Sequence, residues 1–171
     1  MPKRLILTAA LAALFLASCM RTTKPVNAAS RLECRLETDG PAAVRFTLVN
    51  RTDAPLWALR WNTPLEGWRG TIFELSSGGT EIPYTGPMVK RGDPVREDYI
   101  EIPAGGKAEG TVDLALVYDL AKPGTYRLRV TGGLQDLIAD SSAVPRPRDR
   151  HEPAPLDCPE IEVGVGVEKL K

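Results

Sequence analysis

Histidine is nearly absent from this chain of 171 residues, which contains His151 and no other. Histidine is the side chain that most often serves as a general base or activates a nucleophile. His151 stands in a proline-rich segment with no evident nucleophile beside it. The sequence also lacks a Gly-x-Ser-x-Gly motif and a glycine-rich phosphate loop ahead of a helix. We therefore expect no catalytic residues, no cofactor and no enzymatic activity.

An excess of positive charge is missing too. The chain has 22 Lys and Arg against 22 Asp and Glu. Without Lys3 and Arg4, which belong to a removable N-terminal segment, 20 basic residues face 22 acidic ones, a net charge of −2. A protein that binds nucleic acid neutralises phosphates with Lys and Arg. We therefore expect no nucleic-acid partner.

The sequence has no hydrophobic run of membrane-spanning length. The run from Leu5 to Ala17 holds 13 residues, whereas a spanning helix needs about 20. With Lys3 and Arg4 in front, it has the length and charge typical of a signal peptide. A short membrane anchor is the alternative interpretation.

The run ends in Leu16-Ala17-Ser18-Cys19, which resembles the lipobox of bacterial lipoproteins. The resemblance implies that residues 1–18 are a lipoprotein signal peptide and that Cys19 is lipidated. Residues 19–30 would then be a flexible tether, and acyl chains would anchor the protein to a membrane. Met20, in place of an aspartate, favours the outer membrane of the cell envelope. An ordinary signal peptide with a chance cysteine is the alternative.

Cysteine is scarce, with three residues in the chain. If Cys19 carries lipid, Cys34 and Cys158 remain as an even pair in an oxidising compartment, which favours a disulfide. The bridge would close a loop of 124 residues, worth about 4.5–5 kcal/mol in the chain-entropy model. Two buried free thiols are the alternative.

Alternation of apolar and polar residues recurs from Leu32 onward, between turns rich in Gly, Pro and Asn. Helical patterns are scarce, with room for a single turn within residues 114–121. Residues 31–171 are therefore predicted to form one all-β domain, an immunoglobulin-like antiparallel β-sandwich of about seven to nine short strands. The predicted strands are 32–36, 44–49, 56–61, 71–75, 81–84, 99–102, 111–114, 126–130 and 161–163.

Two further segments have an open interpretation. Tyr126 follows the turn Lys122-Pro123-Gly124 and resembles the tyrosine corner of immunoglobulin-like sandwiches, although a plain turn and an edge tyrosine would give the same pattern. Residues 141–157 contain four prolines and predict an exposed, mobile loop or a strap. That segment is either a partner-binding loop or a surface insertion held by the Cys158 bridge.

The middle of the chain carries a series of motifs in a specific order. Together they resemble the N-terminal pro-domain of the deuterolysin-type (peptidyl-Lys) metalloendopeptidases, over roughly half of the mature chain. The matching pieces are Asn62-Thr63-Pro64-Leu65-Glu66-Gly67, Tyr84-Thr85-Gly86 with Lys90-Arg91, Tyr118-Asp119-Leu120, and Gly124-Thr125-Tyr126.

The zinc domain of those enzymes has no counterpart in this sequence. The resemblance would place zinc on a His-Glu-x-x-His helix, where two histidines one turn apart bind the metal. A single histidine cannot supply that pair. We expect the resemblance to extend to the β domain alone, without a metal site.

Two long connections hold the candidate binding residues. One connects strands near residues 62–70 and the other covers residues 84–98. Long ordered loops in a sandwich are often functional, and Trp and Arg are enriched in binding hot spots. The alternatives are that Trp57 or Trp61 fills the core and that Lys90 and Arg91 are solvated. The candidates are Leu65, Trp68, Met88, Lys90 and Arg91.

These features favour a non-catalytic, membrane-anchored protein-binding module of the cell envelope. Its partner would be a protein, in the sharpest form a secreted protease that this chain inhibits or helps to fold, as a pro-domain does. A structural or adhesive envelope lipoprotein is the first alternative, and a hydrolase of unrecognised type is the second.

Overall fold

The computed structural model describes residues 31–166. The predicted signal peptide, Cys19 and the tether lie outside these residues. The described part is all-β, as predicted, with short 3₁₀ turns between strands. Its strands are β1 (Leu32–Thr38), β2 (Ala43–Asn50), β3 (Leu56–Leu59), β4 (Phe73–Ser77), β5 (Thr80–Ile82), β6 (Tyr99–Ile102), β7 (Lys107–Asp113), β8 (Gly124–Val130), β9 (Leu137–Ile138) and β10 (Ile161–Val165). The turns are η2 (Pro64–Glu66), η3 (Arg96–Asp98), η4 (Leu114–Leu116), η5 (Ser141–Ala143) and η6 (Arg148–Arg150).

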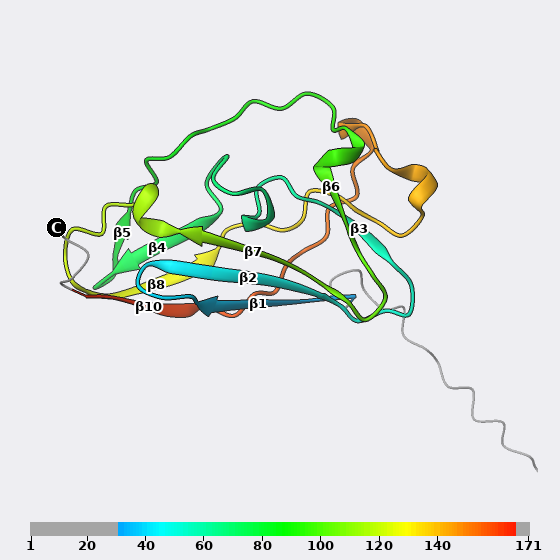
Figure 1. Ribbon diagram of the computed structural model, residues 1–171. Coiled ribbons are helices and arrows are strands. Elements are labelled where there is room, and N and C mark those ends of the chain that lie inside the picture. The colour runs from blue at the N-terminus through cyan, green and yellow to red at the C-terminus, as the bar shows by residue number, and fades with distance from the viewer. Residues whose placement is uncertain (1–30, 167–171) are drawn as a thin grey trace, which may run out of the picture.

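The strands form three antiparallel sheets in two layers (Figure 1). One layer has the order β1-β2-β7, and the facing layer has the order β10-β8-β4-β5. These orders correspond to the A-B-E and G-F-C-C′ strands of immunoglobulin-like sandwiches. The third sheet, β6-β3-β9, extends the first layer, because β3 follows β2 and β6 precedes β7. The predicted sandwich is confirmed.

Asn50 connects the first and third sheets. It ends β2 and is fully buried. Its side-chain amide donates to the carbonyls of Ala54, Ile102 and Pro103 at 2.8–3.1 Å. Its Oδ1 accepts from the backbone N and the hydroxyl of Thr52 at 2.9 and 2.7 Å. One side chain thus satisfies the backbone groups that the break between β2 and β3 leaves without ladder partners.

The core lies between the two layers. Alternate residues of β2, among them Phe46 and Leu48, are fully buried, and so are Phe73 and Leu75 of β4 and Leu128 of β8. Period-two burial is what a strand with one face on a core requires. A smaller apolar cluster sits beside β3 and β6 and is built from Leu59, Trp61, Tyr99, Ile138 and Val144.

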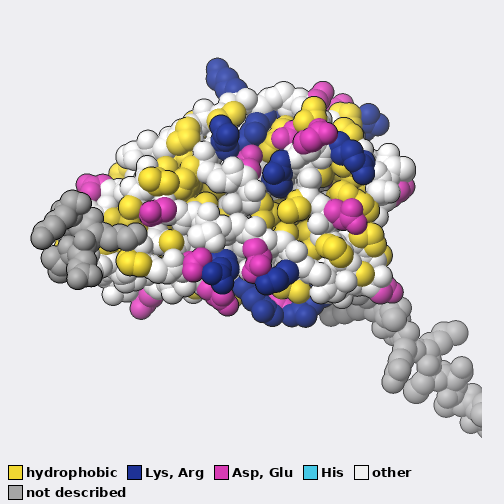
Figure 2. Space-filling view, in the orientation of Figure 1, with side chains coloured by type: hydrophobic (Ala, Val, Ile, Leu, Met, Phe, Trp, Pro, Cys, Tyr) yellow, Lys and Arg dark blue, Asp and Glu magenta, His cyan; other side chains and the backbone are white. Residues whose placement is uncertain are grey.

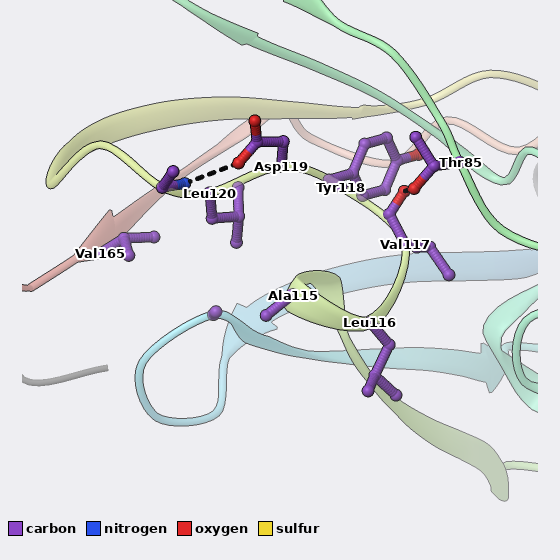
Figure 3. Close-up of a pocket in the computed structure, with 10 residues that line it drawn as sticks. Thr85, Ala115, Leu116, Val117, Tyr118, Asp119, Leu120 and Val165 are labelled. Atoms are coloured by element: carbon purple, nitrogen blue, oxygen red, sulfur yellow. Dashed lines mark hydrogen bonds between the residues drawn. The ribbon is translucent and has the colours of Figure 1, made fainter. Parts of the chain in front are cut away.

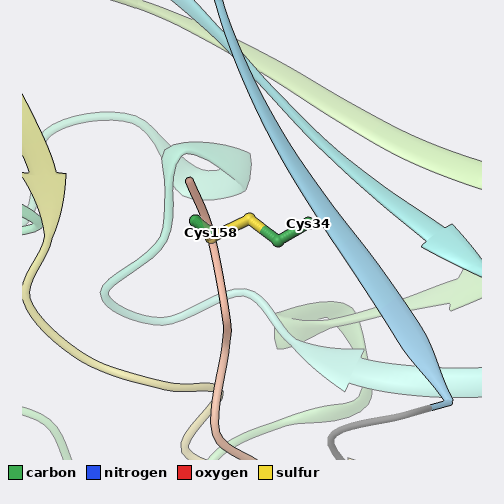
Figure 4. The surroundings of a disulfide bond; sticks show 2 residues. All are labelled: Cys34 and Cys158. Carbon is green, nitrogen blue, oxygen red and sulfur yellow. A yellow bond between two sulfur atoms is a disulfide. The ribbon is translucent and has the colours of Figure 1, made fainter. Parts of the chain in front are cut away.

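The predicted disulfide is present. Cys34 of β1 and Cys158 are bonded, with their Cα atoms 4.8 Å apart (Figure 4). Cys158 stands three residues before β10, so the bridge connects the first strand to the segment that leads into the last. The two sheets of the sandwich are therefore joined covalently as well as by packing.

Tyr126 forms the predicted tyrosine corner. Its ring is buried near the start of β8, and its hydroxyl donates to the Lys122 carbonyl at 2.6 Å. The interpretation as a plain turn with an edge tyrosine is therefore wrong. The corner lies on the strand that corresponds to F, the position it has in immunoglobulin-like sandwiches.

Candidate functional site

A long connection between β5 and β6 crosses one side of the sandwich (Figure 1). We call residues 84–98 the arch. Tyr84 pairs with Tyr118 in an isolated bridge, and Thr85 N donates to the Val117 carbonyl at 2.8 Å. Further along, Val89 N donates to the Arg69 carbonyl at 3.0 Å. The arch is therefore held to the body of the domain by backbone hydrogen bonds.

The arch meets the Asn62–Gly67 segment through an ion pair. Arg91 Nη2 lies 2.6 Å from Glu66 Oε2, and the two side chains are 23% and 10% exposed. The other Glu66 oxygen accepts from Asn62 N at 2.7 Å. The Arg91 guanidinium also lies over the ring of Trp61, 4.9 Å from its centroid. Two of the motif segments quoted above are thus in direct contact, and Arg91 is not simply solvated.

Trp68 belongs to an aromatic cluster inside the arch. Its ring centroid is 6.0 Å from those of Phe73, Tyr84 and Tyr118, and its indole N–H donates to the Asp113 carbonyl at 3.0 Å. Aromatic pairs at this separation add to stability beyond their buried area. Burial raises the pKa of Tyr84, and burial, followed by the neighbouring Tyr84, raises the pKa of Tyr118 to about 12. The indole of Trp68 therefore supports the arch.

Met88 and Lys90 are the candidate residues that lie on the surface. Met88 is 73% exposed, and two further hydrophobic residues of the arch, Val89 and Val95, are 41% and 56% exposed. Leu65 is half-buried against the core. Figure 2 shows basic side chains interspersed with acidic and hydrophobic ones over this face. The binding role of the candidates stays a prediction; the structure places Met88 and Lys90 where a partner could reach them.

A polar pocket of about 320 Å³ opens beneath the arch. Three arginines line it, together with two carboxylates and two apolar side chains. Arg60, Arg69 and Asp98 were not among the sequence-predicted residues, because each comes from a different part of the chain and none has a motif of its own. The lining residues are Arg60, Leu65, Glu66, Arg69, Val89, Arg91 and Asp98.

Residues 141–157, which we call the strap, are anchored at their centre by a buried carboxylate. Asp136 is fully buried, accepts from the Tyr99 hydroxyl at 2.8 Å, and forms an ion pair with Arg146 at 3.1 Å. Glu152 N donates to the same carboxylate at 2.9 Å. Burial, followed by the hydrogen bond to Asp136, raises the pKa of Tyr99. Of the two interpretations of this segment, a strap is the one that these contacts support.

The strap also supports the arch. Arg148 Nη1 donates to the Arg91 carbonyl at 2.7 Å, and Arg148 N donates to Asp93 at 3.1 Å. Near the other end, Arg96 Nη1 donates to the Val144 carbonyl at 3.2 Å. The two irregular segments therefore hold each other in place.

A second hollow, of about 380 Å³, opens beside η4 (Figure 3). It is lined by the segment 115–121, Thr85, Ala42 and Val165. Leu116 of η4 stands at its edge and is 72% exposed. No pattern in the sequence indicates this hollow, because its walls come from separate segments that meet through the fold alone.

Residues 31–166 contain neither a membrane-spanning helix nor a cluster of metal-binding side chains. No helix there has the length and apolar character needed to cross a membrane. No three His, Cys, Asp or Glu side chains in the same part of the chain stand close enough to share a metal ion.

No protein-family model matches the chain. Among curated proteins, it is similar to a neutral protease 2 homolog of Arthroderma gypseum, with 27% identity over 138 residues that cover 80% of this chain and 37% of that protein. An extracellular protease of Aeromonas hydrophila is 29% identical over 86 residues, 50% of this chain and 25% of that protein. A probable neutral protease 2 homolog B of Trichophyton rubrum is 29% identical over 107 residues, with 60% and 29% covered.

These matches confirm the predicted resemblance to proteases of the deuterolysin type. The chain spans between 25% and 37% of the length of the relatives it matches. The shared region is therefore a part of each of those proteins and between 50% and 80% of this one.

Proposed function

We propose that this protein is a non-catalytic, protein-binding β-sandwich module, and that its partner is a protease related to the neutral protease 2 homologs. The observation that carries the proposal is the extent of the match to the Arthroderma gypseum protease: the aligned region covers 80% of this chain but 37% of that protein. A region that accompanies a protease domain commonly masks or assists that domain, and we propose the same action for this module on its partner. The module would act as an inhibitor or as a folding assistant.

We further propose that the module is a lipoprotein of the cell envelope, held at the outer membrane through Cys19. The proposal is supported by the residues Leu16-Ala17-Ser18-Cys19 after a short apolar run. Mass spectrometry of the mature N-terminus would show a lipid-modified Cys19. A mature protein that begins elsewhere, or that stays in the soluble fraction, would contradict the anchor and leave the binding proposal standing.

The exposed part of the arch is the surface we assign to the partner. Met88 is a large apolar side chain on a backbone that hydrogen bonds hold in place; Val89 beside it and Val95 further along the arch are exposed as well. Apolar side chains on a preorganised surface favour association because less conformational entropy is lost on binding.

A matched pair of variants tests this surface. Residues 31–171, which contain the whole core and the disulfide, would be mixed with a purified neutral protease 2-type enzyme and a fluorogenic peptide. We expect the wild-type protein to bind and to slow cleavage, and Met88→Glu to weaken binding at least tenfold, about 1.4 kcal/mol. Leu116→Glu is the control, because Leu116 is as exposed (72% against 73%) but lies on η4.

Two outcomes would contradict the proposed function. If capture from envelope and secreted fractions recovers structural envelope proteins and no protease, the structural or adhesive alternative replaces it. If the pure protein itself hydrolyses members of a broad substrate panel, the alternative of an unrecognised hydrolase replaces the proposed function.

A further inference from the structure

The pocket beneath the arch contains more arginine than its own carboxylates can pair. Arg91 is held by Glu66 at 2.6 Å. The second carboxylate, Asp98, accepts from Val95 N at 2.8 Å and forms no ion pair within the described residues. Arg60 and Arg69 therefore have no carboxylate partner among residues 31–166.

Arg60 also has an unsatisfied donor. Its Nη2 donates to the Glu97 carbonyl, but its Nε is buried and has no hydrogen-bond partner among residues 31–166. Arg69 forms no ion pair and no side-chain hydrogen bond in the same part of the chain. A buried donor without a partner is rare in a native protein and calls for an acceptor, because desolvation without a hydrogen bond is unfavourable.

We propose that this pocket binds the carboxylate side chain of a glutamate or aspartate on the protein partner, an inference that rests on the proposed function and specifies its partner's chemistry. Three guanidinium groups against two carboxylates give the lining a formal charge of +1. That charge matches a monoanion. Guanidinium groups bind carboxylates through paired, charge-assisted hydrogen bonds, which makes arginine the residue suited to this recognition.

The shape and the other lining residues agree with a side chain as the ligand. The pocket holds about 320 Å³, at the lower end of the range for small-molecule sites. Leu65 and Val89 line it beside the arginines, so that methylene groups next to the carboxylate would have apolar contacts. A phosphate has no such methylene groups and carries more charge than the lining balances.

The pocket is continuous with the exposed surface of the arch. Val89 lines the pocket and is 41% exposed, and the adjacent Met88 is 73% exposed. The hydrogen bond from Val89 N to the Arg69 carbonyl fixes the pocket relative to these side chains. The recognised feature would thus be an acidic residue flanked by apolar residues.

A titration followed by NMR tests the pocket without the partner. The Nε–Hε signals of the arginines would be recorded while the peptide acetyl-Leu-Glu-Leu-amide is added, and separately its Gln counterpart. We expect saturable shifts of the Arg60 and Arg69 signals with the Glu peptide, and at least tenfold weaker binding of the Gln peptide. Arg69→Ala should weaken binding of the Glu peptide at least fivefold.

Arg127→Ala is the control, because it also removes one positive charge but lies on β8, where its side chain is 67% exposed. Its binding should equal that of the wild type, and equal melting temperatures would show that both variants fold. Equal binding of the Glu and Gln peptides, or tighter binding of inorganic phosphate than of the Glu peptide, would overturn the proposal.

The protease assay separates this inference from the proposed function. If Arg69→Ala slows the protease as well as the wild type and the Glu peptide causes no shift, the module binds its partner but the carboxylate pocket is wrong. If the Glu peptide binds as expected while no neutral protease 2-type enzyme is bound, the pocket stands and the proposed class of partner is wrong.

Discussion

Asn50 is the buried polar residue on which the junction between two sheets depends. Its amide contacts the carbonyls of Ile102 and Pro103 across the break, and it contacts Ala54 and Thr52 on its own side. The sequence indicates a turn at this place but cannot show that its asparagine is fully buried. Burial follows from the pairing of β3 with β6, whose partner residues are 40 to 46 positions apart in sequence.

Replacing Asn50 should destabilise the protein strongly. Asn50→Ala leaves several buried backbone groups without partners, so we expect the free energy of unfolding to fall by about 3 kcal/mol, as measured by urea denaturation. Thr52→Val removes one hydroxyl that donates to Asn50 and is expected to cost about 1 kcal/mol or less. Equal losses in the two variants would show that the amide network is not what connects the sheets.

The candidate binding residues show what residue type predicts and what it does not. Trp68 and Arg91 have side chains of the types that favour interfaces, yet both are used within the fold, in the aromatic cluster and in the ion pair with Glu66. Met88 and Lys90 lie exposed on the arch. Residue type indicates which groups a side chain can contact. Only packing decides whether that side chain faces solvent or the protein interior.

At the scale of elements, η2 packs closely on β7 at a glycine. A Cβ atom added to Gly110 would lie 2.4 Å from the Pro64 carbonyl oxygen and 2.8 Å from its carbon, both backbone atoms that cannot move aside. The Asn62–Gly67 motif can therefore pack on β7 only if position 110, which is distant in sequence, has no side chain.

Gly110→Ala should separate η2 from β7. Overpacking against backbone is expected to lower the free energy of unfolding by about 2 kcal/mol in chemical denaturation. Gly92→Ala is the matched control, because no atom lies within 4 Å of its added Cβ, and it should change stability little. If both variants were equally stable, the close approach of η2 would not be a constraint on this strand.

The strap depends on the buried pair Asp136–Arg146. Arg146 also contacts Glu152 at 3.1 Å, and the His151 ring lies 3.2 Å from the Arg146 carbonyl. Proline-rich composition predicted exposure of this segment, and several of its residues are exposed. It did not predict the anchor, because the aspartate that holds the strap lies outside it.

Removing the cation should free the strap. Arg146→Ala leaves the Asp136 carboxylate buried without its charge partner, and we expect a loss of about 3 kcal/mol together with faster proteolysis within residues 141–157. Arg150→Ala, an exposed change in the same segment, should stay within about 0.5 kcal/mol of the wild type. Unchanged proteolysis in Arg146→Ala would contradict the anchoring role.

For the whole molecule, buried tyrosines set the alkaline limit of stability. Tyr118 is 4% exposed, donates to the Phe73 carbonyl at 2.7 Å, and has its pKa raised by burial to about 12. Tyrosine in the unfolded chain ionises near pH 10. Between these two values the unfolded state loses its proton and the folded state keeps it, so stability falls as the pH rises.

The free energy of unfolding should therefore be steady up to about pH 9 and fall between about pH 10 and 12. The expected slope is up to about 1.4 kcal/mol per pH unit for each such tyrosine. Tyr118→Phe should be less stable at neutral pH, because it lacks the hydrogen bond to Phe73, but its slope should be shallower. The same slope in wild type and variant would assign the alkaline loss to other groups, such as lysines.

By itself the sequence determined the local properties of this protein. Period-two alternation placed nine of the ten described strands, the turn before Tyr126 indicated the corner, and two remaining cysteines indicated the bridge. Each of these signals lies within a few residues or follows from counting. The exception among the strands is β9, which has two residues and is too short to show an alternating pattern.

Only the tertiary structure decided which distant residues meet. The arginine pocket takes its lining from residues 60–69 and from the arch, the Asn50 network joins β2 to β6, and the arch contacts the strap. Such meetings depend on the order of strands in the sheets and on close backbone approaches, which no local pattern encodes. The surface left for a partner is therefore set by packing, because the same packing partly buried Trp68 and left Met88 exposed.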